Sequence, residues 1–484
     1  MNLRLVARIV GALVLIIAAF MLIPAMIALA ARDARTMVAF LVPVAVMTTV
    51  GGLVLVGTRN LKAPALTPRD GYLLVSVSWL TAAAFGALPF YLSGSMPTYT
   101  NAFFETMSGF TTTGASILTQ IESLPKSLLF WRSLTHWLGG MGIVVLTVAV
   151  LPLLGIGGLQ LIQAEAPGPS VDRLTPRITE TAKILWFLYL GFTLLEIAFL
   201  MFGGMNLFDA TTHTFGTLAT GGFSPKNASV GYYHSLYING VITVFMLLAG
   251  MNFALHFKLL LGPRKPIFRD SELKAYLLIF LVATIVITVD LFQSGAFQSL
   301  SETVSHAAFQ SASILTTTGY ATTDFERWPF LSQTVLVFLM FIGGCSGSTG
   351  GGIKVIRIVT LLKQGLNEMK QLVHPRAVLT LKISGRSVKN SIIFAISGFF
   401  FLYVFLVLIV TLIVASAEYD ILTSLTTALA TIGNIGPGLG LVGPAENYGF
   451  YPAWIKWVLS FAMMIGRLEI YTVMVLFTPA FWRR

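Results

Sequence analysis

Long apolar runs constrain the fold of this chain more than any other feature of its sequence. A helix of about 20 residues is long enough to cross the hydrocarbon core of a bilayer, which is about 30 Å thick. Runs of that length recur from one end of the sequence to the other. We therefore predict ten membrane-spanning helices, at roughly residues 8–31, 37–57, 71–93, 130–154, 182–203, 234–261, 273–293, 331–362, 390–417 and 453–481.

Composition agrees with a membrane protein that has no sizeable soluble domain. The 484 residues are 56% hydrophobic and 11% charged, whereas soluble domains carry about 25% charge. The first run, 9–31, is longer than the roughly 7–15 residues of a signal-peptide core, so we expect it to be a retained helix. The single cysteine, Cys345, excludes an intrachain disulfide. The net charge of +11 forms no basic stripe interleaved with aromatic residues, so no nucleic-acid partner is expected.

The distribution of lysine and arginine predicts which way the chain crosses the membrane. With the N-terminus inside, 23 of the 31 basic residues fall in inner segments and 5 in outer segments. Cytoplasmic loops carry such an excess of positive charge. Both termini are therefore predicted to be cytoplasmic. The outer segments also carry many carboxylates, which could concentrate cations by their field or could be ordinary solvated loop charges.

Four threonine- or glycine-rich segments recur between pairs of predicted spans. They are 111–115, 218–222, 316–320 and 433–437, and each follows 10–15 moderately apolar residues of half-membrane length. Glycine lets a loop bend so that its carbonyls face an axis, and stacked carbonyl rings can replace the water shell of a cation. We predict a monovalent-cation pore surrounded by four such loops, each preceded by a pore helix.

Two further features fall below the predicted filter. The run 343–352 is too rich in glycine and small polar residues to stay helical in lipid, so it is either an intramembrane gate or a flexible turn. Arg467 lies in the middle of the last predicted span, where a charge costs at least about 2.5–3.5 kcal/mol unless it faces water or a partner. It would act as an electrostatic barrier in the pore, or form an ion pair with Glu469 or Glu196.

The four loops together with the run 343–354 resemble the superfamily of Trk, Ktr and HKT potassium transporters. The extra N-terminal helix pair and the segment 434–440 are most similar to its bacterial TrkH-type pore subunits. The resemblance implies an all-α polytopic membrane protein with four tandem helix–pore-helix–filter-loop–helix repeats around one pore, preceded by two extra transmembrane helices. It also implies a filter glycine in each repeat, and Gly114 in the first repeat favours potassium over sodium.

The resemblance assigns roles to particular residues. The implied filter residues are Thr112, Thr113, Gly114, Ala219, Thr220, Gly221, Thr317, Thr318, Gly319, Asn434, Ile435 and Gly436. The implied gate residues are Gly344, Cys345, Ser346, Gly347, Ser348, Thr349, Gly350 and Arg467. Repeat four departs from the pattern, because Ile435 carries no hydroxyl and Pro437 stiffens the backbone.

Five segments follow from this organisation. We predict an N-terminal helix pair at 1–66 and pore repeats at 67–170, 171–268, 269–388 and 389–484, with the gating loop 343–352 in the third.

The function expected from the resemblance is gated, selective potassium uptake across the bacterial cytoplasmic membrane. K+ is then the transported ion, and no organic cofactor is expected. The expected partners are a cytosolic TrkA-like nucleotide-binding subunit, a second copy of the chain and membrane lipid, to which the basic stretch 354–389 offers an inner surface. A proton- or sodium-coupled symporter is the alternative, although only Glu196 and Glu469 approach the centres of spans. An enzyme is not expected, because no nucleophile–base or metal constellation occurs.

Overall fold

A computed structural model describes residues 1–60, 66–142, 178–261, 269–377 and 379–483. The second half of the predicted span 130–154 lies outside these residues. Within the described residues, six helices are long and apolar enough to cross a membrane, and two further pairs qualify if each bent pair is counted as one span. The apolar windows of the six are only 22–56% buried within the protein, so much of their surface faces outward. The chain is a membrane protein.

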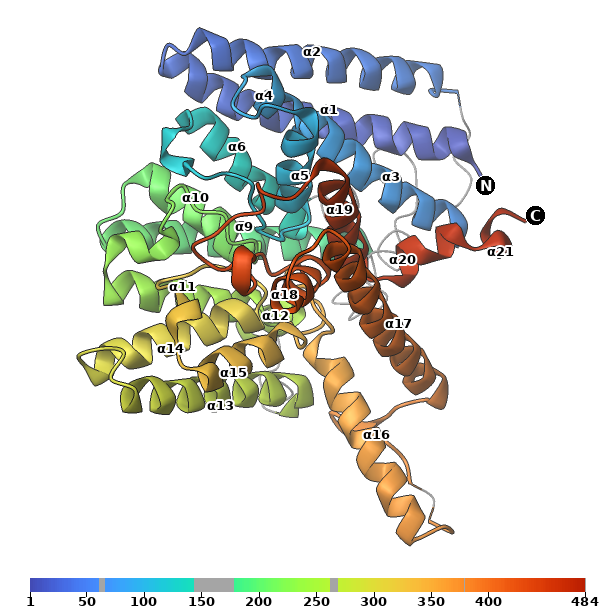
Figure 1. The fold of residues 1–484 in the computed structure, drawn as a ribbon. Helices are drawn as coiled ribbons and strands as arrows, with labels where there is room; N and C mark the ends of the chain where they lie inside the picture. Colours follow the sequence, from blue (N-terminus) through green and yellow to red (C-terminus); the bar gives the residue numbers. More distant parts are fainter. Residues whose placement is uncertain (61–65, 143–177, 262–268, 378, 484) are drawn as a thin grey trace.

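The first two helices form a hairpin beside the remaining bundle. They are α1 (Leu3–Ala30) and α2 (Ala34–Gly57), and they lie together at one edge of the molecule in Figure 1. Gly51 allows their close contact, because a Cβ at that position would lie 2.9 Å from the carbonyl oxygen of Gly11. Asp33 caps α2 by accepting a hydrogen bond from the Thr36 amide, which explains the sharp turn between the helices.

The rest of the chain repeats one order of elements four times: a first helix, a short pore helix, a loop and a second helix. Repeat 1 contains α3 (Pro68–Gly86), α4 (Leu88–Leu92), α5 (Tyr99–Phe110), η1 (Ile121–Ser123), α6 (Lys126–Trp137) and the π-helical turn η2 (Leu138–Gly142). Repeat 2 contains α9 (Ile178–Phe202), α10 (Leu207–Leu218), η4 (Ser229–Tyr233), α11 (Leu236–Ala249) and α12 (Phe253–Leu261). The pore helices of these two repeats are α5 and α10.

The same order continues in the second half of the chain. Repeat 3 contains α13 (Ser271–Gln293), α14 (Leu300–Leu315), η6 (Phe325–Arg327), α15 (Phe330–Met340) and α16 (Val355–Val373). A small hairpin of β1 (Lys382–Ile383) and β2 (Arg386–Ser387) follows α16. Repeat 4 contains α17 (Asn390–Ala415), α18 (Ile421–Ile432), η7 (Gly440–Val442), α19 (Ala453–Arg467), α20 (Tyr471–Met474), η8 (Val475–Phe477) and α21 (Pro479–Trp482). Here α14 and α18 are the pore helices.

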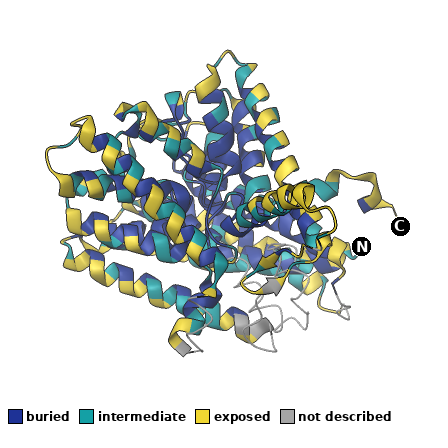
Figure 2. Cartoon of the chain, turned by 90° about the horizontal axis from the view of Figure 1, so that it is seen from below, coloured by how far each residue is buried: buried dark blue, intermediate teal, exposed yellow. Residues whose placement is uncertain are grey.

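A local sequence signal starts each pore helix. The residue before it is Thr98, Asn206, Ser299 or Asp420, and each of these side chains accepts a hydrogen bond from the backbone amide three residues later. Such caps satisfy an otherwise unpaired amide at a helix start and are worth about 1 kcal/mol each. The pore helices are largely buried at the centre of the molecule, where dark residues gather in Figure 2.

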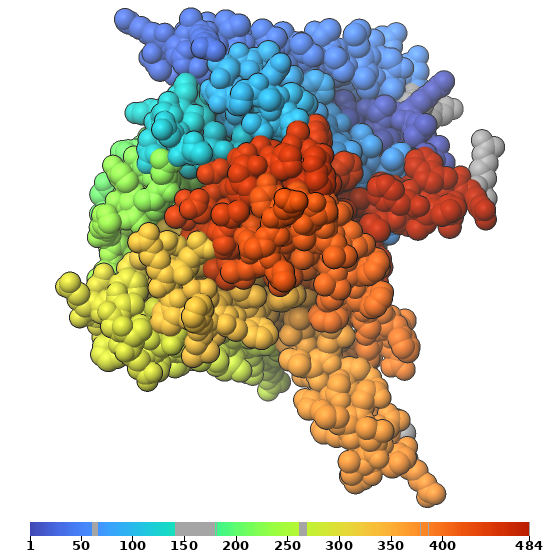
Figure 3. Space-filling view, in the orientation of Figure 1, coloured from blue at the N-terminus to red at the C-terminus, as the bar shows by residue number. Residues whose placement is uncertain are grey.

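The second helices of repeats 2, 3 and 4 break below the loops. The chain bends by 99° between α11 and α12 and by 112° between α19 and α20. In repeat 3 the glycine-rich segment 343–352 separates α15 from α16, so the predicted spans 234–261, 331–362 and 453–481 are broken rather than straight. The helix α16 projects from the bundle in Figure 3.

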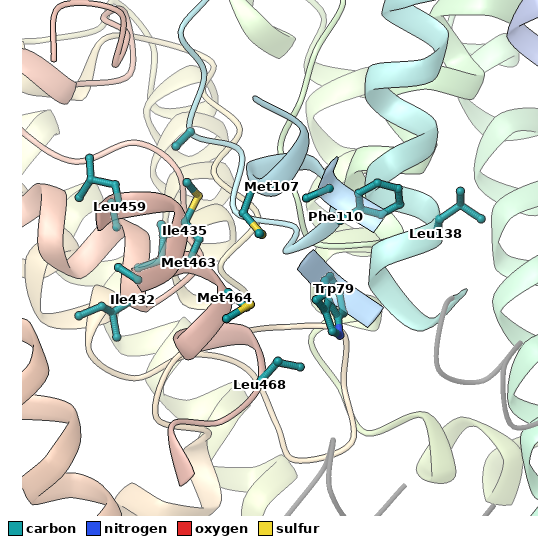
Figure 4. Close-up of a cluster of buried hydrophobic side chains, with 14 of the residues drawn as sticks. Trp79, Met107, Phe110, Leu138, Ile432, Ile435, Leu459, Met463, Met464 and Leu468 are labelled. Atoms are coloured by element: carbon teal, nitrogen blue, oxygen red, sulfur yellow. The ribbon is translucent and has the colours of Figure 1, made fainter. Parts of the chain in front are cut away.

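Repeat 4 packs back against repeat 1 and closes the bundle. Figure 4 shows Met107 and Phe110 of α5 on one side and Leu459, Met463 and Met464 of α19 on the other, in one buried apolar cluster. The four pore helices are thereby drawn around a common centre.

Candidate functional site

The four loops that follow the pore helices share one backbone pattern. We call them loop 1 (111–115), loop 2 (219–223), loop 3 (316–320) and loop 4 (433–437). The second residue of each has a positive φ, which is uncommon for a residue that carries a side chain. These residues are Thr112 (φ 52°), Thr220 (54°), Thr317 (60°) and Asn434 (53°).

A left-handed glycine lies two residues further along each loop. These ring glycines are Gly114 (φ 81°), Gly222 (77°), Gly319 (82°) and Gly436 (96°). Backbone in such sparsely populated conformations costs about 1–3 kcal/mol where a side chain is present, and it clusters at functional sites.

Contacts between neighbouring loops close the ring glycines into a circle. A Cβ built on each ring glycine would lie less than 3.0 Å from a carbonyl oxygen of the next repeat. The contacts run from Gly114 to Gly221, from Gly222 to Thr318, from Gly319 to Ile435 and from Gly436 back to Thr113. Every ring position therefore faces a neighbouring backbone too closely for any side chain, which explains why all four are glycine.

The predicted residues of repeat 2 need a correction of one position. We predicted Ala219, Thr220 and Gly221, but the left-handed ring glycine is Gly222 and not Gly221. Gly221 takes the place held by Thr113 in loop 1, and Ala219 is the cap of α10. Because Gly221 and Gly222 are adjacent, the sequence did not show which of them is the ring glycine. Counting from the end of each pore helix would have revealed it, since the ring glycine lies four residues beyond that end in every repeat.

Side chains behind the loops hold the ring together. The hydroxyls of Thr111 and Thr113 lie 2.8 Å apart, and those of Thr316 and Thr318 lie 2.7 Å apart. Loop 4, which has no threonine, uses Asn434: its Nδ2 donates to Thr113 Oγ1 at 2.9 Å. This bond links repeat 4, whose loop lacks the threonine of the other three, directly to repeat 1.

An open cavity lies on the side of the ring where the chain leaves the four loops, which is the predicted outer side. It has a volume of about 170 Å³, and all four ring glycines contribute to its lining. Glu446 also lines it. The two pore-helix carboxylates Glu105 and Asp209 contact basic side chains instead: Glu105 is buried against Arg132, and Asp209 lies 3.8 Å from Lys226. Beside this outer mouth, Glu326 accepts a hydrogen bond from the Gly440 amide. Partial burial raises the pKa of Glu326, and the Gly440 bond opposes that rise.

The glycine-rich segment 343–352 crosses beneath the ring. Its Cys345 amide donates to Gly250 O at 2.8 Å in repeat 2, and its Gly351 amide donates to Thr317 Oγ1 at 2.7 Å in loop 3. A Cβ on Gly351 would also collide with the Gly433 carbonyl of loop 4. The segment therefore contacts three of the four repeats directly below the loops.

Two carboxylates anchor the ends of this segment. Glu272 of α13 accepts from the Ser346 amide at 2.6 Å and from the Ile356 amide at 3.1 Å. Glu469 forms an ion pair with Arg357 of α16, so one acidic partner considered for Arg467 is engaged elsewhere. Lys354 donates to the Gly350 carbonyl and holds the last turn of the segment.

Arg467 joins the segment to the far side of the pore. Its guanidinium donates to Thr349 O at 2.6 Å, to Gly139 O at 2.9 Å and to Gly140 O at 2.7 Å. One side chain of repeat 4 thus binds backbone carbonyls of repeats 1 and 3. The positively charged guanidinium of Arg467 therefore lies below the ring and bridges the space beneath it.

This fold and site define a membrane protein in which four pore-loop repeats surround a single axis. The family of TrkH cation transport proteins matches residues 38–484, and the chain belongs to it. The chain is 43% identical to the Trk system potassium uptake protein TrkH of Escherichia coli K12, with both chains covered completely. It is 37% identical to TrkG of the same organism, covering 100% of this chain and 99% of TrkG.

A solved structure agrees with the sequence comparison. The crystal structure of the potassium transporter TrkH from Vibrio parahaemolyticus superimposes with a TM-score of 0.89 at 40% identity, and both chains are covered completely. The helical membrane fold and the family expected from the sequence are therefore confirmed, and the small hairpin of β1 and β2 is the described exception to an all-α chain.

Proposed function

We propose that this chain is the potassium-conducting subunit of a Trk system and takes up K+ through a selective, gated pore. The observation that carries the proposal is the closed circle of ring glycines and carbonyls, with an open cavity on its outer side. Rings of carbonyl oxygens substitute for the hydration shell of K+. The names of the relatives, which are potassium uptake proteins, support the same ion.

The proposed filter follows the observed register. It comprises Thr112, Thr113, Gly114, Thr220, Gly221, Gly222, Thr317, Thr318, Gly319, Asn434, Ile435 and Gly436. The proposed gate is the segment from Gly344 to Gly350 together with Arg467, because Arg467 donates hydrogen bonds to Thr349 of the segment and to Gly139 of repeat 1, beneath the ring. Opening then requires those bonds to be exchanged for others or for water.

Flux measurements test the proposal and separate it from the symporter alternative. Glu196, a fully buried carboxyl in α9, is the feature that favours proton coupling. In proteoliposomes, a gated pore gives a K+ current that reverses at the potassium equilibrium potential at every pH. A reversal potential that moves with the proton gradient in wild type, and no longer does so in Glu196→Gln, would establish the symporter instead.

We further propose that the protein lies in the bacterial cytoplasmic membrane with both termini in the cytoplasm. The excess of basic residues in the predicted inner segments supports this orientation. The ring cavity then opens to the outside, and the glycine-rich segment lies on the cytoplasmic side of the ring.

The projecting α16 is the proposed contact region for partners, which we take to be a second copy of the chain and a cytosolic TrkA-like subunit. Five apolar side chains of this helix are exposed, namely Leu362, Leu366, Met369, Leu372 and Val373. The basic residues between 354 and 389 offer an additional surface for anionic lipid. Gel filtration with light scattering, with and without the Leu366→Ser/Met369→Ser pair of substitutions, tests whether this helix supports the dimer.

A further inference from the structure

A buried ion pair lies behind the outer end of loops 1 and 2. Arg132 Nε is 2.7 Å from Glu105 Oε1, and the two side chains are 2% and 0% exposed. Removing both charges from water is costly, so such a pair persists only where further hydrogen bonds compensate it. The compensating bonds at this pair all lead to the filter loops.

The carboxylate of Glu105 holds the exit of loop 1. It accepts from Ser116 Oγ at 2.9 Å and from the Ile117 amide at 2.9 Å, two and three residues beyond the ring residue Gly114. Arg132 holds the exit of loop 2 in the same way, because its Nη1 donates to Ser224 O at 3.0 Å, two residues beyond Gly222. The ion pair is thus a bridge between two neighbouring loops.

A three-layer stack adds a second attachment to loop 2. The Phe223 ring lies 3.5 Å from the Arg132 guanidinium and stacks on His136 with ring centroids 4.0 Å apart. Arg132 and His136 are one turn apart on α6, so two side chains of repeat 1 contact the Phe223 ring of loop 2. A Cβ at Gly221 would collide with the His136 ring, which places this stack directly against the backbone of loop 2.

The other repeats support their loops without this charge pair. Nine residues before the ring glycine, where repeat 1 has Glu105, the described repeats have His213, Gln310 and Thr427. His213 Nε2 lies 3.0 Å from Ser224 Oγ, and Gln310 Nε2 donates to Tyr320 O at 3.4 Å. Leu459 of α19 corresponds to Arg132, because Gly139 and Gly466 abut equivalent carbonyls at the ends of α5 and α18.

We infer that the Glu105–Arg132 pair is a positioning unit that sets the ion preference of the filter without touching the ion. The inference rests on the proposed potassium pore. Ion preference depends on the number and field strength of the carbonyl ligands, and the pair fixes the spacing between the loop 1 and loop 2 carbonyls. Glu105 also neutralises Arg132, which lines the outer cavity next to the path of entering cations.

Two variants test this role by changing the bridge in different ways. Arg132→Lys keeps the charge but loses the planar guanidinium, whose separate nitrogens bind Glu105 and Ser224 at the same time. Glu105→Gln/Arg132→Gln removes both charges and leaves no unpaired buried ion. The matched control is Arg327→Gln, which breaks an ion pair with Asp324 in the outer segment where Arg327 is 86% exposed. The measurement is the K+ to Na+ permeability ratio from reversal potentials of full-length protein in liposomes.

We expect both bridge variants to conduct K+ with a permeability ratio lowered by about fivefold, which corresponds to about 1 kcal/mol of discrimination, and Arg327→Gln to keep the wild-type ratio. An unchanged ratio in well-assembled bridge variants overturns the inference. So does loss of assembled protein in both, since the pair would then serve folding alone. If wild type and Arg327→Gln themselves show no K+ preference, the proposed function fails rather than this inference.

Discussion

At the scale of single residues, the ring depends on backbone conformations that a side chain disfavours. Thr112, Thr220, Thr317 and Asn434 hold positive φ angles, and Asn434 also donates a hydrogen bond to Thr113 of the neighbouring loop 1. The carbonyl of the residue that follows each of them lies against the ring glycine of the preceding repeat. The geometry of the ring is therefore a property of all four loops together.

Gly114→Ser is expected to lower the preference for K+ over Na+. The new Cβ would meet the Gly221 carbonyl, so loop 1 or loop 2 must shift, and a hydroxyl is added near the ligand ring. Permeability ratios in liposomes provide the measurement. Gly204→Ser is a matched control, because Gly204 also has a positive φ (93°) but faces open space outside the filter. An unchanged ratio in folded Gly114→Ser would argue against a filter at this ring.

Arg467→Ala is expected to raise basal K+ flux while leaving ion preference nearly intact. Two like charges about 5 Å apart at an effective dielectric of about 20 repel by about 3 kcal/mol. Relief of that barrier corresponds to a rate factor on the order of 100 before discounting for water. The flux of K+ and the permeability ratio are measured on the same liposomes.

Arg467→Lys distinguishes the barrier from the cross-link. Lysine keeps the charge but cannot bind Thr349, Gly139 and Gly140 together as the guanidinium does. Low flux in the lysine variant would assign the effect to charge, and high flux would assign it to the three hydrogen bonds. Low flux in a well-folded alanine variant would contradict both forms of the prediction.

Glu326→Gln is expected to leave the protein at least as stable as wild type at about pH 7. Burial raises the folded pKa of Glu326, so the folded state favours the protonated carboxyl. The stabilisation linked to that group is present below its unfolded pKa and is lost as the pH rises through the folded pKa. Thermal unfolding in detergent across this range is the measurement, with Glu302→Gln as a control of equal charge change. A clear loss of stability at neutral pH would show that the ionised form and its bond to Gly440 dominate.

The residue scale also shows where sequence reasoning stops. Three of the four ring glycines could be identified because a single glycine follows the threonines or the asparagine. Gly222 was missed because Gly221 precedes it, and the sequence pattern alone does not show where the pore helix ends and the count to the ring glycine begins. The support from Glu105, Arg132 and Phe223 was equally hidden, since the three residues are far apart in sequence and meet only when repeats 1 and 2 pack.

At the scale of elements, the pore helices and the long first helices were predictable from local signals. Side-chain caps begin the pore helices, and apolar length defines the spans. The bends of 99° and 112° in the second helices were not predictable, because both halves are apolar and the break depends on contacts below the ring. The glycine-rich segment was recognised as a break by composition, but its anchoring carboxylates Glu272 and Glu469 could be identified only from the fold.

Removing Ser346, Gly347 and Ser348 is expected to raise K+ flux in the absence of any partner. The shortened segment could no longer reach Gly250 on one side and Thr317 on the other, and so could not stay beneath the ring. Glu272→Gln, which weakens the bonds to Ser346 and Ile356, should act in the same direction with a smaller effect. Reduced flux in a well-folded deletion would make the segment a structural support of the pathway.

At the scale of the whole molecule, the distribution of apolar and charged side chains on the surface determines both that the protein enters a membrane and which way it faces. Apolar side chains cover the outer helices, whereas polar and charged residues collect at the two ends of the spans. The basic residues are placed so unevenly between those ends that they favour one orientation in the membrane. That orientation decides whether the ring cavity or the glycine-rich segment meets the cytoplasm.

Cysteine labelling tests this orientation directly. The native Cys345 is 1% exposed and should stay unlabelled, so it gives a low background. In intact cells, a membrane-impermeant maleimide is expected to label Arg327→Cys, in the predicted outer segment, and to spare Arg376→Cys beyond α16. Both sites should react after permeabilisation, which controls for accessibility. Labelling of Arg376→Cys in intact cells would reverse the orientation, and the glycine-rich segment would then lie on the outer side of the ring, where it could not act as a cytoplasmic gate.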